Sequence, residues 1–373
     1  MIKKINEFTT VTAGGTPSTK NSLYWNGNIP WMNSGELNKH KIFIVEGRIT
    51  QLGLDNSSTK FIPKGSVLIG LAGQGKTRGT AAITYIDTCI NQSIGAILPS
   101  NEHINEFLYY DLTRRYNSMR ELSSGEGGRG GLNLSLLGNI EVDLPTINIQ
   151  HHIVNIMESV DNAIESLKSK LSKINNLHNG YMNSLFHFDN NEVETHKLRE
   201  LVGYIKTGKI DANQMTIDGQ YRFYTCAKNY YYIDKYAFDG EALLISGNGA
   251  NVGYVHHYIG KFNAYQRTYV LMNFHCNVLY LKAYLDYFLS KRISTEVRSG
   301  NTPYITLNTV TDMIINIPKD ENIQKNIANY YQSYILEKEK LEKEITKYEN
   351  IREGLLNGIF TGQIEVPENY EEV

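Results

Sequence analysis

Cysteine is nearly absent from this chain of 373 residues. Its three cysteines, Cys89, Cys226 and Cys276, are too few and too scattered for a disulfide framework or a zinc site. No apolar run approaches the length of a membrane span, and the first residues lack the apolar core of a signal peptide. These absences argue against disulfide-stabilised secreted proteins and membrane-spanning proteins. They predict a cytoplasmic protein with no membrane partner.

The composition is that of a folded chain with little overall charge. Charged residues make up 20% and apolar residues 41% of the chain, and the formal net charge is −2. The length predicts about two to three domains. Lys and Arg outnumber Asp and Glu by 14 to 12 in residues 1–145 and by 13 to 9 in residues 195–318, whereas 146–194 and 319–373 are acidic. Two mildly basic regions are compatible with a nucleic-acid partner and equally with ordinary surface charge.

The most informative feature is an internal duplication. Residues 150–186 and 324–360 align without a gap at a constant offset of 174 positions, and Gly79 falls on Gly253 at the same offset. A period this long is not that of a solenoid repeat. It predicts that one unit, a lobe followed by a helix, occurs twice and gives a pseudo-two-fold molecule.

The duplicated segments have the pattern of long helices. Apolar positions recur in alternating steps of three and four residues, which is a heptad seam. In the first copy the seam comprises Ile153, Met157, Val160, Ile164, Leu167, Leu171 and Ile174, continued by Leu177, Tyr181 and Leu185. In the second copy it comprises Ile327, Tyr331, Tyr334, Leu341, Ile345 and Tyr348, continued by Ile351, Leu355 and Ile359. Each helix is expected to span about 33 residues, or roughly 50 Å. Because so narrow a seam needs a partner, we expect the two copies to pair antiparallel; the alternative is that each helix packs on its own lobe.

One segment of the first lobe matches a nucleotide-binding motif. Gly70–Thr77 fits the phosphate-loop pattern G-x-x-x-x-G-K-[ST] and follows an apolar, strand-like run at 66–69. A working phosphate loop opens a helix, but the pattern of Ala81–Tyr85 is that of a strand. The duplicate at 246–253 keeps the glycines and lacks the Lys-Thr pair. The sequence therefore predicts a tight turn between two strands, and nucleotide binding is not expected.

Other catalytic patterns are incomplete. Gly247–Gly249 resembles the glycine loop of adenosylmethionine-dependent methyltransferases, and Asn301–Tyr304 approaches their Asn-Pro-Pro-Tyr motif without its first proline. The lobe is also short for that fold. His151–His152 and His256–His257 lack partners at zinc-ligand spacing. The sequence therefore predicts neither a catalytic constellation nor a metal site.

Several short motifs follow one another in a specific order. They are Gly-Gly-Thr-Pro-Ser, Ile-Pro-Trp, Gly-Ser-Val-Leu-Ile, a passage from Leu-Asn to Leu-Pro, and a long helix that begins with Gln and ends Gly-(x)5-Phe. From about Ile5 to Gln363 this order, with its duplication, resembles the specificity subunits of type I restriction–modification enzymes. The resemblance implies two target-recognition domains that each read one half of a bipartite, asymmetric double-stranded DNA target. It also implies that two methyltransferase subunits bind adenosylmethionine, that two motor–nuclease subunits supply ATP/Mg-dependent cleavage, and that this chain is not an enzyme.

We therefore expect an α+β fold with two pseudo-symmetric α/β target-recognition domains, separated by two long helices that form an antiparallel coiled coil. The expected segments are residues 1–145 for the first domain, 146–194 for the first helix and a linker, 195–318 for the second domain, 319–363 for the second helix, and 364–373 for an acidic tail. Two alternatives stay open. One is a related restriction system with a fused methyltransferase–nuclease partner, and the other is an enzyme that binds nucleotide at the Gly70–Thr77 loop.

Lysine and arginine bind phosphates, while Asn, Gln and Arg read base edges. In the first lobe the candidate DNA-binding residues are Lys20, Asn33, Lys60, Gln74, Lys76, Arg78, Arg114, Arg115 and Arg129. In the second lobe they are Lys206, Lys209, Arg222, Lys228, Asn248, Asn251, Arg267, Lys291, Arg292 and Arg298. Gln92 and Gln266 occur in both lobes, which should read different sequences, so we assign them to structure or phosphate contact. The tyrosines of residues 195–318 are expected mostly in the core, although Tyr230–Tyr232 cannot all be buried in one strand.

Overall fold

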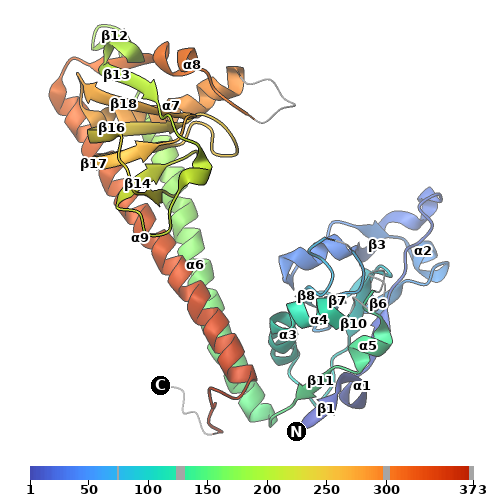
Figure 1. Ribbon diagram of the computed structural model, residues 1–373. Helices are drawn as coiled ribbons and strands as arrows, with labels where there is room; N and C mark the ends of the chain where they lie inside the picture. The colour runs from blue at the N-terminus through green and yellow to red at the C-terminus, as the bar shows by residue number, and fades with distance from the viewer. Residues whose placement is uncertain (74, 123–130, 297–302, 369–373) are drawn as a thin grey trace. The chain divides into compact units, whose positions relative to one another are not determined.

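The computed structural model describes the whole chain except residues 74, 123–130, 297–302 and 369–373. The chain forms two compact units, one comprising Met1–Ser166 with the segment from Ile345 onward, and the other Leu167–Glu344. Each unit holds one lobe and part of both long helices (Figure 1). Three of the candidate DNA-binding residues, Gln74, Arg129 and Arg298, lie outside the described residues.

The first lobe is a mixed α/β structure built on two small sheets. One sheet has the strand order β2-β10-β7-β8-β4 and the other β5-β3-β9-β6. The strands are β1 (Ile2–Lys4), β2 (Val11–Ala13), β3 (Trp25–Met32), β4 (Lys41–Ile42), β5 (Arg48–Ile49), β6 (Lys60–Ile62), β7 (Val67–Gly70), β8 (Ala81–Thr84), β9 (Thr88–Ile90), β10 (Ile94–Ile97) and β11 (Glu141–Asp143). The helices are α1 (Ile5–Phe8), α2 (Gln51–Asp55), α3 (Asn105–Arg114), α4 (Tyr116–Leu122) and α5 (Leu134–Gly138), with 3-10 turns η1 (Ser22–Tyr24) and η2 (Ser34–Lys39).

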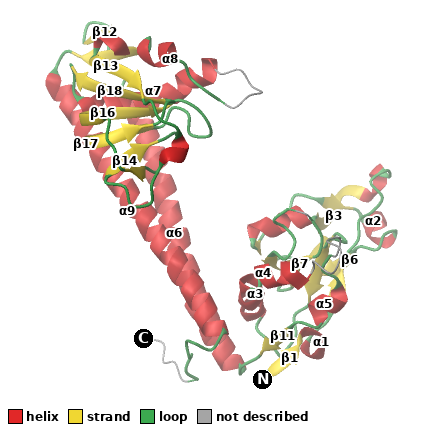
Figure 2. Cartoon of the chain, in the orientation of Figure 1, coloured by secondary structure: helices red, strands yellow, loops and turns green. Residues whose placement is uncertain are grey.

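The second lobe gathers its main strands into one six-stranded sheet, in the order β13-β18-β16-β17-β14-β15. Its strands are β12 (Val193–Lys197), β13 (Val202–Thr207), β14 (Tyr221–Tyr224), β15 (Tyr231–Ile233), β16 (Phe238–Ser246), β17 (Val255–Ala264), β18 (Thr268–Phe274) and β19 (Ile314–Pro318). Its helices are α7 (Val278–Glu296) and α8 (Leu307–Thr311), with 3-10 turns η3 (Leu198–Glu200) and η4 (Ala212–Gln214). Figure 2 shows that strands and loops make up much of both lobes.

Both lobes are built around the same buried hairpin. Alternate residues of a strand face opposite sides of a sheet, so β7 directs Val67 and Ile69 into the cluster that contains α3, and Leu68 into a second cluster on the other face. In the second lobe β16 does the same: Leu243 and Ile245 pack with α7, and Leu244 packs on the opposite face. The predicted apolar strands are therefore confirmed as central strands buried on both faces.

Each lobe also begins and ends on a two-stranded antiparallel ribbon. In the first lobe β1 pairs with β11, and in the second β12 pairs with β19. The turn after each first strand is closed in the same way, because the backbone N–H of Lys4 donates to Glu7 at 2.9 Å and that of Lys197 donates to Glu200 at 3.1 Å. The repeated ribbon confirms the pseudo-symmetry predicted from the duplication.

The long helices are α6 (Ile147–Leu185) and α9 (Glu321–Phe360). Both are longer than the expected 33 residues, at 39 and 40 residues, because each begins within three residues of the proline that ends the preceding lobe. Within each unit they lie side by side and run antiparallel (Figure 1). Asp161 contacts Arg352 at 2.6 Å, whereas Asn175, further along α6, accepts a hydrogen bond from Tyr334, which lies earlier in α9. The predicted antiparallel coiled coil is confirmed.

The seam departs from the heptad pattern toward the C-terminal end of each helix. Most of the proposed seam residues are buried or half-buried, but Leu177 is 72% and Ile351 38% exposed. Their places are taken by the next residues, since His178 stacks on Tyr334 and Arg352 binds Asp161. An α-helix of 3.6 residues per turn drifts away from a 3.5-residue repeat, so the contact face shifts by one position in both copies. The prediction of Leu177 and Ile351 as seam residues was wrong, whereas Tyr181, although 48% exposed, contacts Tyr330 of α9 at 4.6 Å between ring centres.

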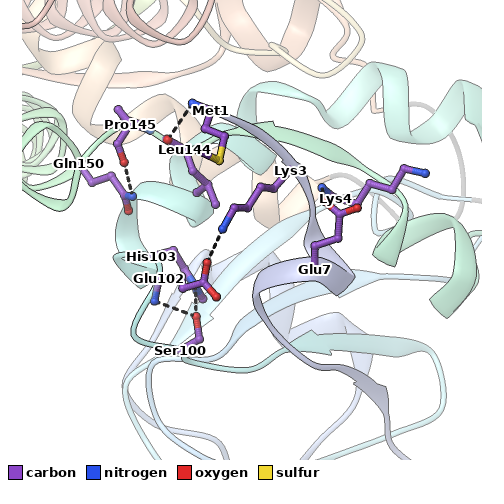
Figure 3. Close-up of polar contacts among 10 residues, drawn as sticks. All are labelled: Met1, Lys3, Lys4, Glu7, Ser100, Glu102, His103, Leu144, Pro145 and Gln150. Carbon is purple, nitrogen blue, oxygen red and sulfur yellow. Dashed lines mark hydrogen bonds and ion pairs between the residues drawn. The ribbon is translucent and has the colours of Figure 1, made fainter.

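A glutamine joins each lobe to its long helix. Gln150 is fully buried; its side chain accepts from the backbone N–H of Ile104 at 2.8 Å and donates to the carbonyl of Pro145 at 3.0 Å (Figure 3). In the second copy Gln324 donates to the carbonyl of Pro318 at 2.9 Å. The two glutamines therefore fix the point where each helix leaves its lobe.

Replacing Gln150 with Leu is expected to destabilise the protein by about 2 to 3 kcal/mol, because a buried N–H and a buried carbonyl lose their partners. Urea unfolding of the two proteins measures the difference. The matched control is Gln324→Leu, whose side chain is only half-buried and makes one such bond, and it should cost about 1 kcal/mol. Equal losses in the two variants would contradict this account.

Candidate nucleic-acid interface

In the first lobe, the loop between β7 and β8 carries two of the candidate cations, Lys76 and Arg78; Arg78 is half-buried and donates to the carbonyl of Gly73 at 3.1 Å. Side chains of helix α4 bind main-chain carbonyls of this loop. The hydroxyl of Tyr116 donates to the carbonyl of Lys76 at 2.9 Å, and Arg120 donates to the carbonyls of Gly75 and Arg78 at 2.8 and 3.3 Å. The Lys76 side chain is exposed. The loop therefore presents Lys76 to solvent from a backbone that is fixed by side chains of α4.

This loop is not built like a phosphate loop. The chain runs from β7 through turns into β8, which pairs antiparallel with β7, with Ile69 opposite Ala81. The predicted strand after Thr77 is confirmed. A phosphate loop needs the N-terminal amides of a helix at this point, and a strand does not supply them.

The isolated chain is therefore expected not to bind ATP at micromolar concentration. Isothermal titration of the chain and of its Lys76→Ala variant with ATP and Mg²⁺ measures this, and the two proteins should give the same null result. Micromolar binding that is lost in Lys76→Ala would restore the nucleotide-binding alternative.

The remaining candidate side chains of the first lobe differ in their exposure and in their hydrogen bonds and ion pairs. Asn33 caps η2 by accepting from the N–H of Gly35 at 2.8 Å. Arg114 and Arg115 both pair with the buried carboxylate of Asp111, at 2.9 and 2.8 Å. The charge of these arginines is therefore partly compensated inside the lobe. Lys20 is exposed on the loop before η1, and Lys60 is exposed at the start of β6, where it donates to Thr12 at 2.9 Å.

In the second lobe, tyrosines and cations alternate over the sheet edge formed by β17, β14 and β15. The guanidinium of Arg222 lies 4.2 Å from the ring centre of Tyr230 and 4.6 Å from that of Tyr258. Lys261 lies 4.7 Å from the ring of Tyr236. Aromatic rings next to cations are the side chains that stack on bases and attract the phosphate backbone. We refer to Arg222, Tyr230 and Tyr258 as the Arg222 cluster.

The Arg222 cluster opens into a cavity of about 910 Å³ between the sheet edge and α9. Tyr232, Tyr254, His256 and Lys282 line the same cavity. Burial lowers the pKa of His256, whose Nε2 lies 2.9 Å from the carbonyl oxygen of Ala227. His256 is therefore mainly neutral near pH 7, so the cationic side chains of the cavity are Arg222, Lys228, Lys282 and Lys338, and Glu339 and Glu342 of α9 line it as well.

The other candidates of the second lobe fall into two groups. Asn251 and Arg292 use their side chains within the lobe, since Asn251 donates to the carbonyl of Cys226 at 3.1 Å and Arg292 to that of Asp312 at 3.0 Å, while the main chain of Asn248 forms an isolated β-bridge with Tyr304. Five others are exposed cations, namely Lys206, Lys209, Lys228, Arg267 and Lys291. Gln92 accepts from Thr16 at 2.6 Å and Gln266 contacts Asp211 at 3.4 Å, so each bonds to a neighbouring loop of its own lobe.

The expectation that the tyrosines of the second lobe lie mostly in the core was wrong. Tyr230, Tyr231 and Tyr232 are 37%, 39% and 41% exposed, and the sheet edge leaves Tyr236, Tyr254 and Tyr304 exposed as well. The buried ones are Tyr224, Tyr269, Tyr280 and Tyr284. A phenol ring carries a hydroxyl that water satisfies at no cost, so it suits an edge better than a core. The expectation that Tyr230–Tyr232 cannot all be buried is confirmed, but sequence reasoning gave neither Tyr230 nor Tyr258 a role at the interface.

In the described part of the chain, no cluster of three or more His, Cys, Asp or Glu side chains is placed to hold a metal ion. The same residues include no helix that is both long and apolar enough to cross a membrane.

Comparison with known proteins identifies the family. The profile described as "Type I restriction modification DNA specificity domain" matches residues 1–176 and 190–348, so each match covers one lobe and at least part of the helix that follows it. The chain belongs to this family. The predicted family and the predicted duplication are both confirmed.

Individual type I specificity subunits show the same likeness. The EcoDI specificity subunit of Escherichia coli is 33% identical over 172 residues, 45% of this chain and 37% of that protein. The MjaIX specificity subunit of Methanocaldococcus jannaschii is 31% identical over 173 residues, 45% of this chain and 39% of that protein. These matches thus span less than half the length of either relative. A crystal structure of a type I system S subunit from M. genitalium covers 96% of both chains with a TM-score of 0.67 at 20% identity, which shows a shared fold.

Proposed function

We propose that this type I specificity subunit is the non-catalytic DNA-recognition component of a restriction–modification complex. Each lobe reads one half of a bipartite, asymmetric target in double-stranded DNA. The two long helices set the separation of the half-sites and, with the lobes, dock two methyltransferase subunits. Those subunits bind adenosylmethionine, and two motor–nuclease subunits bring ATP hydrolysis and cleavage.

The observation that supports this proposal is that the two lobes share a scaffold but expose different side chains. Both lobes have the terminal ribbon, the buried hairpin and a glutamine in the first turn of the long helix that donates to the preceding proline carbonyl. Their exposed polar surfaces differ, since the first presents Lys76 on a loop held by α4 and the second presents the Arg222 cluster. Two readers of different half-sites need a common scaffold and unlike contact residues.

The exposed cations are the proposed phosphate contacts, and they are Lys20, Lys60, Lys76, Lys206, Lys209, Lys228, Arg267 and Lys291. Contacts of this kind position a lobe on the duplex without reading its sequence. Arg78 and Asn248 are proposed to act nearer to the bases. Asn33, Arg114, Arg115, Asn251 and Arg292 are proposed to act mainly through the shape of their lobes, because the structure engages their side chains internally.

Co-expression with methyltransferase subunits of type I systems tests the proposal. The two proteins are expected to co-purify, and the complex should methylate sites that share two short fixed sequences separated by a gap of constant length. Mapping methylated sites across a genome that carries the pair measures this. Absence of both the complex and any sequence-specific methylation would refute the proposal, whereas a partner that carries methyltransferase and nuclease in one polypeptide would favour the related-system alternative.

A further inference from the structure

We propose that Arg222 reads a guanine in the half-site of the second lobe, and that Tyr230 and Tyr258 are positioning residues that hold its guanidinium in the reading orientation. This inference rests on the proposed function and assigns one base contact within it. It is carried by the geometry of the Arg222 cluster and by what replaces that cluster in the first lobe.

The guanidinium of Arg222 lies over two tyrosine rings. Its centre is 4.2 Å from the Tyr230 ring centre and 4.6 Å from that of Tyr258, and Tyr232 meets the edge of Tyr230 at 5.5 Å between ring centres. An exposed arginine loses side-chain freedom when it binds a ligand. Here the rings restrict that freedom beforehand, so less of it remains to be lost on binding.

The donors of Arg222 are left largely available. A guanidinium has five N–H donors in one plane, and the structure gives Arg222 a hydrogen bond to the Tyr224 hydroxyl at a long 3.4 Å. Two ring contacts reduce the directions from which a ligand can reach the group, and its N–H donors point outward in its own plane. A planar edge with two acceptors in line matches this geometry, and in the major groove that edge is the N7 and O6 of guanine.

The first lobe lacks this cluster, although the strands that carry it are present. In the second lobe β14 pairs parallel with β17, with Phe223 opposite Asn263. In the first lobe β3 pairs parallel with β9, with Trp31 opposite Cys89, which is 174 positions before Asn263. Phe223 therefore corresponds to Trp31, and Arg222 to Pro30.

The position of Tyr258 differs in the same way. The residue 174 positions earlier is Thr84, which is fully buried in β8. A cluster that is present in the second lobe and replaced at the corresponding positions of the first is what reading of a half-site specific to that lobe requires.

Arg222→Lys in the complete complex is the central test. Lysine keeps the charge and loses the planar fork, so binding to unrelated DNA should change little, while one G·C position of the target should lose its preference by about 5- to 100-fold. The probes are duplexes of the mapped target in which each guanine is replaced in turn by 7-deazaguanine, which lacks N7. The wild-type complex should be sensitive at one guanine, and the Arg222→Lys complex insensitive there.

Variants of the rings separate positioning from folding. Tyr258→Phe and Tyr230→Phe keep the rings and should retain the guanine preference, whereas Tyr258→Leu and Tyr230→Leu should weaken it without lowering affinity for unrelated DNA. The matched control is Tyr236→Leu, which removes the other ring–cation contact of this sheet edge, between Tyr236 and Lys261, and should leave the preference unchanged.

Three results would overturn the assignment while leaving the proposed function intact. They are an Arg222→Lys complex as selective as wild type, a uniform loss of affinity for all duplexes, and a wild-type complex that tolerates 7-deazaguanine at every position. A wild-type complex with no sequence preference would instead refute the proposed function.

Discussion

Deleting one heptad from each long helix is expected to shorten the gap between the two half-sites by about three base pairs, without changing either half-site sequence. The deletions are 164–170 in α6 and 338–344 in α9. Seven helical residues rise about 10 Å, and one base pair rises about 3.4 Å. The lobes are untouched, so the bases that they read should stay the same.

The contacts of the coiled coil make these segments the right ones to remove. On one side of the deletion Asp161 binds Arg352 at 2.6 Å, and on the other side Tyr334 donates to Asn175 at 2.9 Å. Both contacts remain after the deletions, and a loss of seven residues preserves the heptad phase of the seam. The shortened helices should therefore still pair.

Mapping methylated sites for both versions, in the presence of the methyltransferase subunit, measures the gap. A chain that lacks only 164–170 is the control: its two helices no longer match in length, so it should assemble poorly or lose activity. A stable, active double deletion that keeps the original gap would show that the helices do not set the spacing.

Acidification from pH 7 to pH 5 is expected to cost about 4 kcal/mol of folding stability, about 2 kcal/mol from each of two buried histidines. His178 and His103 are 9% and 4% exposed, and burial lowers the pKa of each to about 4. Around His178, Asp286 opposes this shift and Lys338 adds to it, both less strongly than burial.

The loss of stability on acidification follows from the different protonation of these histidines in the folded and the unfolded chain. An imidazole in the unfolded chain titrates near pH 6.5, so between about 6.5 and 4 the unfolded chain binds protons that the folded chain does not. The stabilisation is complete above pH 6.5 and is lost as the pH falls toward 4.

The variant His178→Phe tests the contribution of the histidine in the coiled coil to this pH dependence. The His178 ring stacks flat on Tyr334, with 3.5 Å between ring centres and 3° between planes, and phenylalanine keeps a flat ring that cannot be protonated. Urea unfolding at pH 7 and pH 5 should show a pH effect smaller by about 2 kcal/mol than in wild type. His151→Phe, on the exposed side of the same helix, should leave the pH effect unchanged. An unaltered pH effect in His178→Phe would contradict this account.

The coiled coil shows where a periodic pattern holds and where it fails. The heptad pattern correctly predicted two helices and their antiparallel pairing, because apolar spacing along one helix is a local property. It failed at Leu177 and Ile351, where His178 and Arg352 make the contacts instead. Those contacts depend on accumulated drift and on the facing helix, and neither is visible in one segment of sequence.

What the sequence by itself determined was the architecture: a duplicated unit, two long paired helices, a turn and not a phosphate loop at Gly70–Thr77, and the family. Each of these rests on periodicity or on the order of local motifs. Only the tertiary structure decided which candidates stand together. Arg222 and Tyr258 are 36 residues apart and meet because β14 pairs with β17, while Arg114 and Arg115 share the buried charge of Asp111. Sheet pairing and burial join residues that are distant in the chain, and for that reason the composition of a lobe cannot rank its own contact residues.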